Sequence, residues 1–538
     1  MSFTDQERVA IEPYFTNADE PVFALTNLPE TVKGALFARY SRSPKSLRRL
    51  FLDEFYEGVG SATGAGAIGA GVRADKAEKL YQRVFSDYGD DSVAQLGGVH
   101  LAVEDASNIL TKILERGRLM AYLEQSTRYI PYTERRGDRW RYLVPAELDN
   151  HPLRAEYIAT MNATFEIYAR WIPTMQAWFE ARYPKAPGDS DAVHRAAIRT
   201  KALDTLRGLL PAATQSNVGI YGTGQAFEAL LLRMRAHPLA EARSTADLML
   251  QELRKVIPAF LARVDQPDRG GRWTNYLASA RARTAEIAAR LTSGVEMSRA
   301  DEVTLVDFDP DGEAKVVAAA LYTSSSLPDA ELLALARRMS AADREAVLAA
   351  YVGDRSNRRH KPGRAFERTS YRFDVLTDYG AFRDLQRHRL MTIEWQSLTP
   401  EHGYTQPEDL IEAGADSDWR QVVDASAALF DKMTTAGLRE AAQYAVSMAY
   451  RVRFIMDMNA REAMHVIELR TAPQGHPAYR RVCQQMHTLI DRTAGHHAIA
   501  AAMKYVDHSQ VELERLQEER RLAIKRAAQG PGAVEGAR

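Results

Sequence analysis

Two stretches of this 538-residue chain are imperfect copies of one another, and this repetition constrains the fold more than any other feature. One copy reads RGRLMAYLEQSTRY over residues 116–129, and the other reads RHRLMTIEWQSLTP over residues 387–400. Both begin Arg-x-Arg-Leu-Met and both place Gln-Ser at the tenth and eleventh positions, with an offset of 387 − 116 = 271 residues. Because repeated stretches within one chain indicate duplicated structural units, the chain is predicted to contain two related lobes.

A second pair of matches follows the first in the same order. Arg233 and Arg243 lie ten residues apart in LLLRMRAHPLAEAR, and Arg470 and Arg480 lie ten residues apart in IELRTAPQGHPAYR. The offset of this pair is 470 − 233 = 237 residues. Two weak matches in the same order favour an internal duplication over chance.

The hydrophobic pattern predicts an α+β protein with helix in excess. Apolar residues recur at three- and four-residue spacing over Val193–Leu210 and over Ala246–Val264, where Pro258 is expected to kink the helix. Strand-like alternation occurs over Val303–Phe308 and over residues 371–375.

Turn-rich and charged segments divide the chain into four predicted parts. A helical N-terminal extension covers residues 1–84, the two lobes cover 85–295 and 302–505, and a charged helix with a flexible tail covers 506–538. Residues 57–71 carry the G-x-G-x-x-G spacing of dinucleotide-binding turns but no buried strand precedes them, so we predict a Gly-rich loop.

Charge and cysteine content exclude several classes of protein. Seventy basic and 71 acidic residues leave a net charge of −1, which argues against a nucleic-acid partner. No apolar run reaches the length of a membrane span and no signal peptide is recognisable, so a cytoplasmic protein without membrane association is expected. Cys483 is the single cysteine, which excludes a zinc site built from several cysteines. His496 and His497 are neighbours in sequence and point to different helix faces, so we expect no metal site there either.

The repeated motifs resemble those of flavin-dependent thymidylate synthases. That family is marked by R-H-R-x-x-S-x-N-E-x-S-x-R-Y, by a later N-x-R with Leu-Arg eleven residues after its Asn, and by A-Q-x-E-I-R. The N-terminal copy matches it at Arg116, Arg118, Glu124, Ser126, Arg128, Tyr129 and, through an R-x-x-L-P element, Arg207. The C-terminal copy matches it at Arg387, His388, Arg389, Ser397, Asn459, Arg461 and Arg470.

Each copy departs from the family pattern, in part where the other copy keeps it, and both lack the motif Asn. The N-terminal copy has Gly117 for the motif His and Leu123 for the motif Asn. The C-terminal copy departs at Glu394, Trp395, Thr399-Pro400, Gln443 and Ala478. This complementary loss predicts a composite site that joins a nucleotide half from the N-terminal copy to a flavin half from the C-terminal copy.

The resemblance implies two fused copies of the flavin-dependent thymidylate synthase fold, each helix-rich with a central antiparallel sheet. It also implies FAD as cofactor, NADPH and methylenetetrahydrofolate as co-substrates, and methyl transfer to a pyrimidine nucleotide such as dUMP. By the same resemblance, Arg470 or Arg233 favours ionisation of the uracil ring. Nucleotide contacts are implied for Glu124, Ser126, Arg128 and Arg207, and flavin contacts for Arg387, His388, Arg389, Asn459 and Arg461.

Family members are homotetramers, so a double-length chain is expected to form a homodimer that mimics the tetramer. Two other interpretations stay open. The chain is alternatively a catalytically diverged paralogue that binds flavin or nucleotide as a sensor or structural subunit, or a related flavin enzyme that acts on another substrate.

Overall fold

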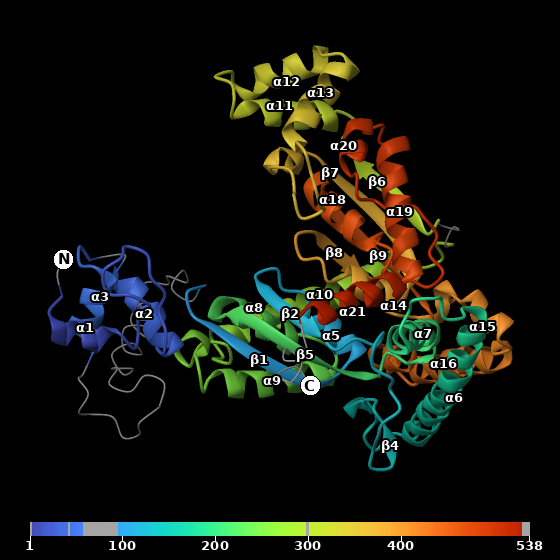
Figure 1. Ribbon diagram of the computed structural model, residues 1–538. Helices are drawn as coiled ribbons and strands as arrows, with labels where there is room; N and C mark the ends of the chain where they lie inside the picture. Colours follow the sequence, from blue (N-terminus) through green and yellow to red (C-terminus); the bar gives the residue numbers. More distant parts are fainter. Residues whose placement is uncertain (1–2, 41–42, 57–94, 297–300, 530–538) are drawn as a thin grey trace. The chain divides into compact units, whose positions relative to one another are not determined.

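The computed structural model describes residues 3–40, 43–56, 95–296 and 301–529, and these residues form two compact units that alternate along the chain (Figure 1). The first unit takes residues 1–106, 117–124 and 217–295, and the second takes 107–116, 125–216 and 296–538. The N-terminal copy therefore contributes to both units. Within the described ranges, none of the helices combines the length and the apolar character that crossing a membrane requires.

The first unit contains a three-stranded sheet of order β1-β5-β2. Its strands are β1 (Gly98–Ser107), β2 (Met120–Glu124) and β5 (Gln215–Thr223), and β2 pairs antiparallel with β5. Its helices are α1 (Asp5–Ile11), α2 (Glu30–Tyr40), α3 (Leu47–Leu50), the π-turn η1 (Phe51–Phe55), α8 (Gly224–Arg235), α9 (Ala240–Leu253), η6 (Ala259–Leu261) and α10 (Gly270–Thr292).

The second unit is built on a four-stranded antiparallel sheet of order β6-β7-β9-β8. The strands are β6 (Val303–Phe308), β7 (Ser370–Asp378), β8 (Thr392–Trp395) and β9 (Arg451–Asn459). Alternate residues of β7 and β9 are buried because successive side chains of a strand point to opposite faces. A short two-stranded ribbon, β3 (Arg135–Arg136) with β4 (Arg139–Trp140), also belongs to this unit.

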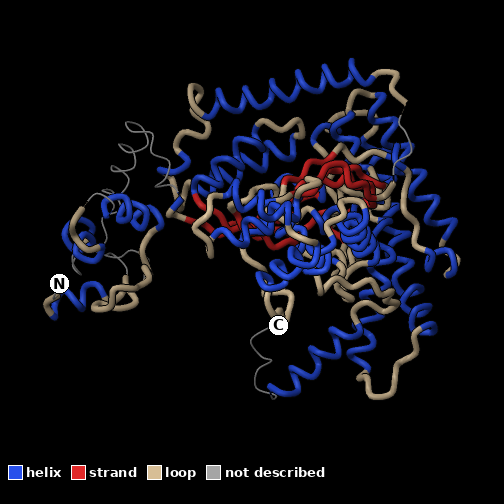
Figure 2. Tube along the Cα trace, turned by 90° about the horizontal axis from the view of Figure 1, so that it is seen from above, coloured by secondary structure: helices blue, strands red, loops and turns tan. Residues whose placement is uncertain are grey.

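Helices predominate over strands in the described residues, as the blue and red segments in Figure 2 show. Helices α14 (Tyr379–Leu385), α18 (Ala460–Arg470) and α19 (Pro477–Arg492) pack on the sheet of the second unit. The other helices are α5 (Asn108–Leu114), η4 (Ala146–Leu148), α6 (Arg154–Arg182), α7 (Asp191–Leu206), η5 (Arg207–Leu209), α11 (Gly312–Tyr322), α12 (Asp329–Arg338), α13 (Ala341–Val352), η7 (Arg364–Arg368), η8 (Pro400–His402), α15 (Glu408–Glu412), α16 (Asp416–Thr435), α17 (Arg439–Ala442), η9 (Gln443–Ala445), α20 (His497–Ala502) and α21 (Leu516–Gln529).

Within the second unit, the two copies are joined by reciprocal backbone hydrogen bonds around an antiparallel bridge between Pro211 and Ser447. These two residues are 447 − 211 = 236 positions apart. Every bond at the bridge has a mate that connects the residues 236 positions away: Ala212 N to Val446 O (2.8 Å) with Met448 N to Leu210 O (2.9 Å), and Ala213 N to Tyr444 O (3.0 Å) with Ala449 N to Gly208 O (3.1 Å). Such pairing is the signature of a twofold relation between equivalent segments.

The structure confirms the prediction of two fused, helix-rich copies with an antiparallel sheet in each, and the strand predicted over Val303–Phe308 is β6. The helix predicted over Ala246–Val264 is wrong in its extent, because α9 ends at Leu253 and only the short η6 follows Pro258. Proline and the restricted residue before it do not sustain a helix. The predicted Gly-rich loop at 57–71 lies outside the described residues.

The close approach of the copies generates a stability prediction at Gly208. A Cβ atom on this residue would lie 2.5 Å from the Trp419 ring, so we expect Gly208→Val to reduce the stability by roughly 1–3 kcal/mol through overpacking. The melting temperature, measured by differential scanning calorimetry, checks this. Gly219→Ala is the matched control, because its added methyl group would lie 3.8 Å from the nearest atom. Equal melting temperatures for the two variants would contradict the argument.

Candidate functional site

Motif residues from both copies meet around Asp384 on α14, inside the second unit. Arg207 of the N-terminal copy donates from Nη1 to the Asp384 carboxylate at 3.4 Å, and Arg470 at the end of α18 donates to its backbone carbonyl. Burial alone would raise the pKa of Asp384, but Arg387, Arg207, Arg470 and Arg128 outweigh it and lower the pKa to about 2. The Asp384 carboxylate therefore stays ionised and offsets the positive charge of four motif arginines.

Arg128 is fixed by contacts to both copies. Its Nε donates to Asp204 Oδ1 at 2.9 Å and its Nη2 donates to Asp204 Oδ2 at 2.6 Å, a two-pronged pair that lies one turn before Arg207. Its Nη1 donates to the Tyr479 hydroxyl at 3.1 Å, and Nη2 also reaches the Gln474 carbonyl. The bidentate geometry fixes the plane of the guanidinium. The predicted neighbour Ser126 accepts a hydrogen bond from the Arg128 N–H at 3.2 Å.

Tyr479, near the start of α19, connects two predicted site arginines. While its hydroxyl accepts from Arg128, its ring centroid lies 5.3 Å from the Arg470 guanidinium. A guanidinium over a tyrosine face is an attractive cation–π contact. Arg128, a predicted nucleotide contact, and Arg470, the predicted catalytic arginine, therefore both contact one aromatic side chain.

Arg207 is the least satisfied of these arginines. It is 4% exposed, its Nη2 has no hydrogen-bond partner, and the nearest Asp378 oxygen lies 3.8 Å away. Gly380 makes room for it, because a Cβ there would lie 2.8 Å from Arg207 Nε. Buried donors are normally bonded, so an unbonded guanidinium nitrogen indicates a missing acceptor.

A cavity of about 370 Å³ lies against Arg207. Its lining comes from α7, η5, the loop before α15, the start of α19 and the segment before α21. The ionisable side chains among the lining residues are Lys201, Asp204, Arg207, Asp378, Glu408, Asp409, His476, Arg481 and Glu514. The cavity is large enough for a nucleoside-sized group.

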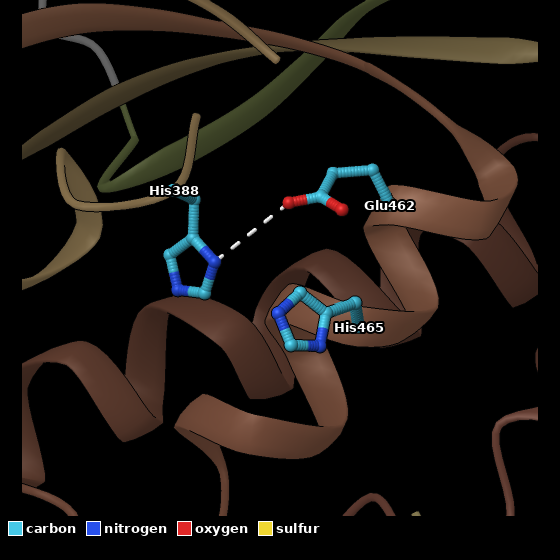
Figure 3. A group of neighbouring side chains, drawn as sticks. All are labelled: His388, Glu462 and His465. Carbon is cyan, nitrogen blue, oxygen red and sulfur yellow. Dashed lines mark ion pairs between the residues drawn. The ribbon is translucent and has the colours of Figure 1, made fainter. Parts of the chain in front are cut away.

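His388 connects Arg470 to a buried acid (Figure 3). Arg470 Nε donates to His388 Nε2 at 2.8 Å, and His388 Nδ1 lies 3.8 Å from Glu462 Oε1. A neutral imidazole that accepts at Nε2 carries its proton at Nδ1, which here faces Glu462. Burial first and then the Arg470 charge hold the pKa of His388 well below its usual range, so the ring stays neutral.

Glu462 is buried and the described residues give its carboxylate no hydrogen bond. Burial raises its pKa to about 7, against smaller opposing effects of Lys361 and Arg461. The pKa of the neighbouring His465 falls to about 4, because of burial and then the charges of Lys361, Arg358, Arg470 and Arg461.

His388, Glu462 and His465 place their ligand atoms within 4.8 Å of one another, a spacing that could hold a metal ion. Two observations weigh against that use. The Arg470 hydrogen bond occupies the Nε2 lone pair of His388, and four basic side chains surround His465. A divalent cation needs free nitrogen lone pairs and a negative environment. The arrangement fits better as a hydrogen-bonded pair of Arg470 and His388, with the Glu462 carboxylate 3.8 Å from the other ring nitrogen.

The other residues predicted to contact flavin lie close to His388 or Glu462 along the sequence. Asn459 caps α18 by accepting from the Glu462 N–H at 2.9 Å, and Arg461 donates to the Pro362 carbonyl at 2.9 Å. Arg387 is exposed and Arg389 half-buried beside His388. The cations that depress the pKa of His465 bring positive charge to this part of the unit, and positive charge of this kind suits an anionic cofactor that carries a diphosphate.

Two predicted residues belong to the first unit and stay predictions. Glu124 ends β2 and is buried, and Arg233 lies on α8. Thr223 caps α8 as Asn459 caps α18, at an offset of 459 − 223 = 236, which puts Met234 rather than Arg233 in register with Arg470.

The motif departures in the C-terminal copy carry structural contacts instead. Glu394 pairs with Arg116 at 2.5 Å, and the Arg116 guanidinium lies 5.3 Å from the Trp395 ring centroid. Gln443, at the position of Arg207, accepts from Leu398 N at 3.1 Å. Thr399, at the position of Arg128, accepts from Glu401 N at 3.4 Å. These side chains bond to their own copy or to Arg116.

Sequence reasoning missed the carboxylates and Tyr479. Asp204 lies three residues before Arg207, and Asp384 lies three residues before Arg387. That spacing puts each acid one helical turn from a motif arginine, which is the signal that was available. Nothing in the sequence around Glu462 or Tyr479 indicated that they face the site. The adjacent histidines that were rejected as a metal site lie outside this site. His496 hydrogen-bonds with the Tyr371 hydroxyl and the Asp309 carbonyl, and His497 pairs with Asp491.

The comparisons with known proteins agree on one family. The family model described as Thymidylate synthase complementing protein (Thy1) matches residues 45–259 and 304–496, one range for each copy. The chain is 36% identical over 522 residues to the UPF0159 protein of Chlamydia muridarum, across 96% of this chain and 98% of that one. It is 30% identical over 533 residues to the UPF0159 protein Ta1429 of Thermoplasma acidophilum, across 92% and 99%.

The chain is also 30% identical over 184 residues to the flavin-dependent thymidylate synthase of Mycobacterium marinum, across 34% of this chain and 68% of that one. Among solved structures, a UMP/dUMP methylase PolB from Streptomyces cacaoi matches 38% of this chain and 96% of its own at 20% identity. Its TM-score of 0.29 carries no structural argument.

The buried acid gives a testable pH dependence. The pKa of Glu462 is raised from 4.5 to about 7, so the folded protein holds a proton that the unfolded chain releases near pH 4.5. Stability from this group is therefore lost as the pH rises from about 4.5 to 7, by on the order of 3 kcal/mol at most. Glu462→Gln, which stays neutral, is expected to raise the melting temperature relative to the native protein more at pH 8 than at pH 5. A difference that does not change with pH would contradict the burial argument.

Proposed function

Because the chain belongs to the Thymidylate synthase complementing protein (Thy1) family, we propose that it is a flavin-dependent enzyme that methylates a pyrimidine nucleotide such as dUMP. In this proposal FAD is the cofactor, methylenetetrahydrofolate supplies the carbon, and NADPH is the reductant. The observation that carries the proposal is Arg207, a buried arginine whose Nη2 lacks an acceptor beside a cavity of about 370 Å³. A phosphate oxygen would satisfy that nitrogen.

The nucleotide half of the proposed site is assigned to Ser126, Arg128 and Arg207. Arg207 supplies the unused donor, while Asp204 and Tyr479 orient Arg128 through bonds of 2.6–3.1 Å. Because these donors are already positioned before a ligand arrives, little reorganisation opposes binding. Glu124 stays with this set as a proposed substrate contact.

Arg470 is the proposed catalytic arginine. Its guanidinium is held by the His388 ring, by the Asp384 carbonyl and by the Tyr479 face. In that position it would favour the ionised form of a uracil ring by hydrogen bonding to the developing negative charge. Arg233 is kept as the equivalent proposal for the N-terminal copy.

The flavin half is assigned to Arg387, His388, Arg389, Asn459 and Arg461. When bound, FAD would supply hydride transfer, which the side chains of the protein cannot perform. The chain's own contribution is electrostatic, because Arg358, Lys361 and Arg461 gather beside His465 and would hold an anionic cofactor. His388, kept neutral by burial and Arg470, would accept or donate a hydrogen bond without adding charge.

A second candidate, a nucleotide-binding protein without turnover, has one observation in its favour. The Arg128 guanidinium is engaged by Asp204, Tyr479 and Gln474, which leaves little donor capacity for a ligand. Oxidation of NADPH that depends on dUMP would decide between the two, since a binding protein would leave NADPH unchanged.

The assembly is proposed to be a homodimer. The Pro211–Ser447 bridge already joins two family copies within one chain, so two chains would supply the four copies of a homotetramer. Light scattering that gives the mass of one chain, or of four, would contradict this proposal.

The visible absorbance spectrum of the purified protein, recorded before and after addition of FAD and then dUMP, tests the function first. We expect a flavin band that shifts when dUMP is added. A colourless protein that takes up no FAD would contradict the flavoenzyme proposal.

Two variants separate the halves of the proposed site. His388→Ala is expected to reduce flavin retention, whereas Arg207→Gln is expected to weaken dUMP binding by about 10-fold or more while flavin stays bound, because one charged hydrogen-bond donor is lost. Arg372→Gln is the control, since Arg372 is exposed on β7 and paired with Asp457. Parallel loss of both ligands in both variants would indicate general destabilisation and contradict the composite site.

A further inference from the structure

A segment beyond the family match forms part of the cavity wall. The matched region ends at residue 496, yet Glu514 lines the cavity beside Arg207 and is only 3% exposed. The segment runs from Asp507 into α21, and α21 packs on α7, which carries Lys201 and Asp204. The extension to the fold therefore reaches the same cavity as the motif residues.

Three contacts fix this segment to the second unit. Arg520 makes a two-pronged pair with Asp189, with Nε–Oδ1 at 2.6 Å and Nη2–Oδ2 at 2.7 Å. The Arg515 guanidinium lies 5.1 Å from the centroid of the Tyr129 ring, the last residue of the N-terminal motif. On the other side, Arg480 Nη2 donates to the Ser509 carbonyl at 2.9 Å.

Glu514 also sets the charge of the cavity. Its carboxylate accepts from Lys201 Nζ at 2.8 Å, and Asp409 lies 3.7 Å from the same nitrogen. Arg481 is committed to Glu302 at 2.6 Å. The lining thus holds five carboxylates, those of Asp204, Asp378, Glu408, Asp409 and Glu514, against three basic groups, those of Lys201, Arg207 and Arg481.

A ligand with one phosphate can pair with Arg207, so that the positive charge of this arginine offsets the negative charge of the phosphate. A second phosphate would add negative charge in a cavity where the acids outnumber the bases and where Lys201 is already neutralised by Glu514. Like charges that a ligand brings into a desolvated site cost affinity, which is a means of rejecting the wrong ligand.

We infer that residues 507–521 are a working part of the substrate site and that Glu514 is a specificity-determining residue. It limits the negative charge that the cavity accepts, so that a pyrimidine nucleoside monophosphate binds and the diphosphate is rejected. This inference rests on the proposed function, since it concerns the nucleotide of that same cavity.

Competition between dUMP and dUDP tests the inference on the full-length protein, with dissociation constants measured by isothermal titration calorimetry. The native protein is expected to bind dUMP about 10-fold more tightly than dUDP, and Glu514→Gln to reduce that ratio about fivefold, chiefly by tightening dUDP binding. Gln keeps an acceptor for Lys201. Glu512→Gln is the matched control, because Glu512 is exposed two residues away and does not line the cavity.

Arg520→Ala is a second variant that leaves every cavity-lining residue in place and loosens only the anchor to Asp189. It is expected to lower the same ratio. An unchanged ratio in both Glu514→Gln and Arg520→Ala, or equal binding of dUMP and dUDP by the native protein, would overturn the inference and leave the proposed function intact. No binding of dUMP by the native protein would overturn both.

Discussion

The reciprocal hydrogen bonds around Pro211 and Ser447 are the constraint on which the rest of the second unit depends. They join the two copies through backbone atoms, which any residue except proline at a donor position can provide. The hydrogen bonds of this frame therefore do not depend on the chemistry of the side chains, only on the space that they occupy, as at Gly208. The copies could diverge in their motifs while the twofold relation of their backbones stayed in place, and the site could become asymmetric on a symmetric scaffold.

That asymmetry is visible at equivalent positions. Arg207 lines the cavity and its buried Nη2 has no hydrogen-bond partner, whereas the Gln443 side chain accepts from Leu398 N of its own copy. Arg128 is buried against Asp204, whereas Thr399 bonds to Glu401. In each pair one copy keeps a charged group that needs a counter-charge, and the other has a neutral group satisfied locally. A neutral side chain that bonds to its own copy stabilises the fold without a ligand. A buried arginine, by contrast, needs a negative partner, which is either an acidic side chain or an anionic ligand.

Acids beside the motif arginines explain how so much positive charge is buried in one place. Asp204 and Asp384 take up part of the charge of Arg128, Arg207, Arg387 and Arg470 before any ligand binds. Because the pKa of Asp384 is lowered to about 2, this counter-charge is present at neutral pH. The consequence is a cavity rich in carboxylates. The same acids that offset the buried arginines therefore also influence which ligand the cavity binds.

The sequence by itself determined the duplication, the family and the strand over Val303–Phe308, because periodicity and motif spacing are local properties of the chain. It misjudged the extent of α9, which ends at Leu253, before Pro258 and the short η6. Only the tertiary structure decided that Asp204, Tyr479 and Glu462 join the motif arginines, and that Glu514 reaches the cavity from beyond the matched region. Partners such as Arg128 and Tyr479 are 351 residues apart, and a contact over that separation is specified by packing rather than by any local pattern.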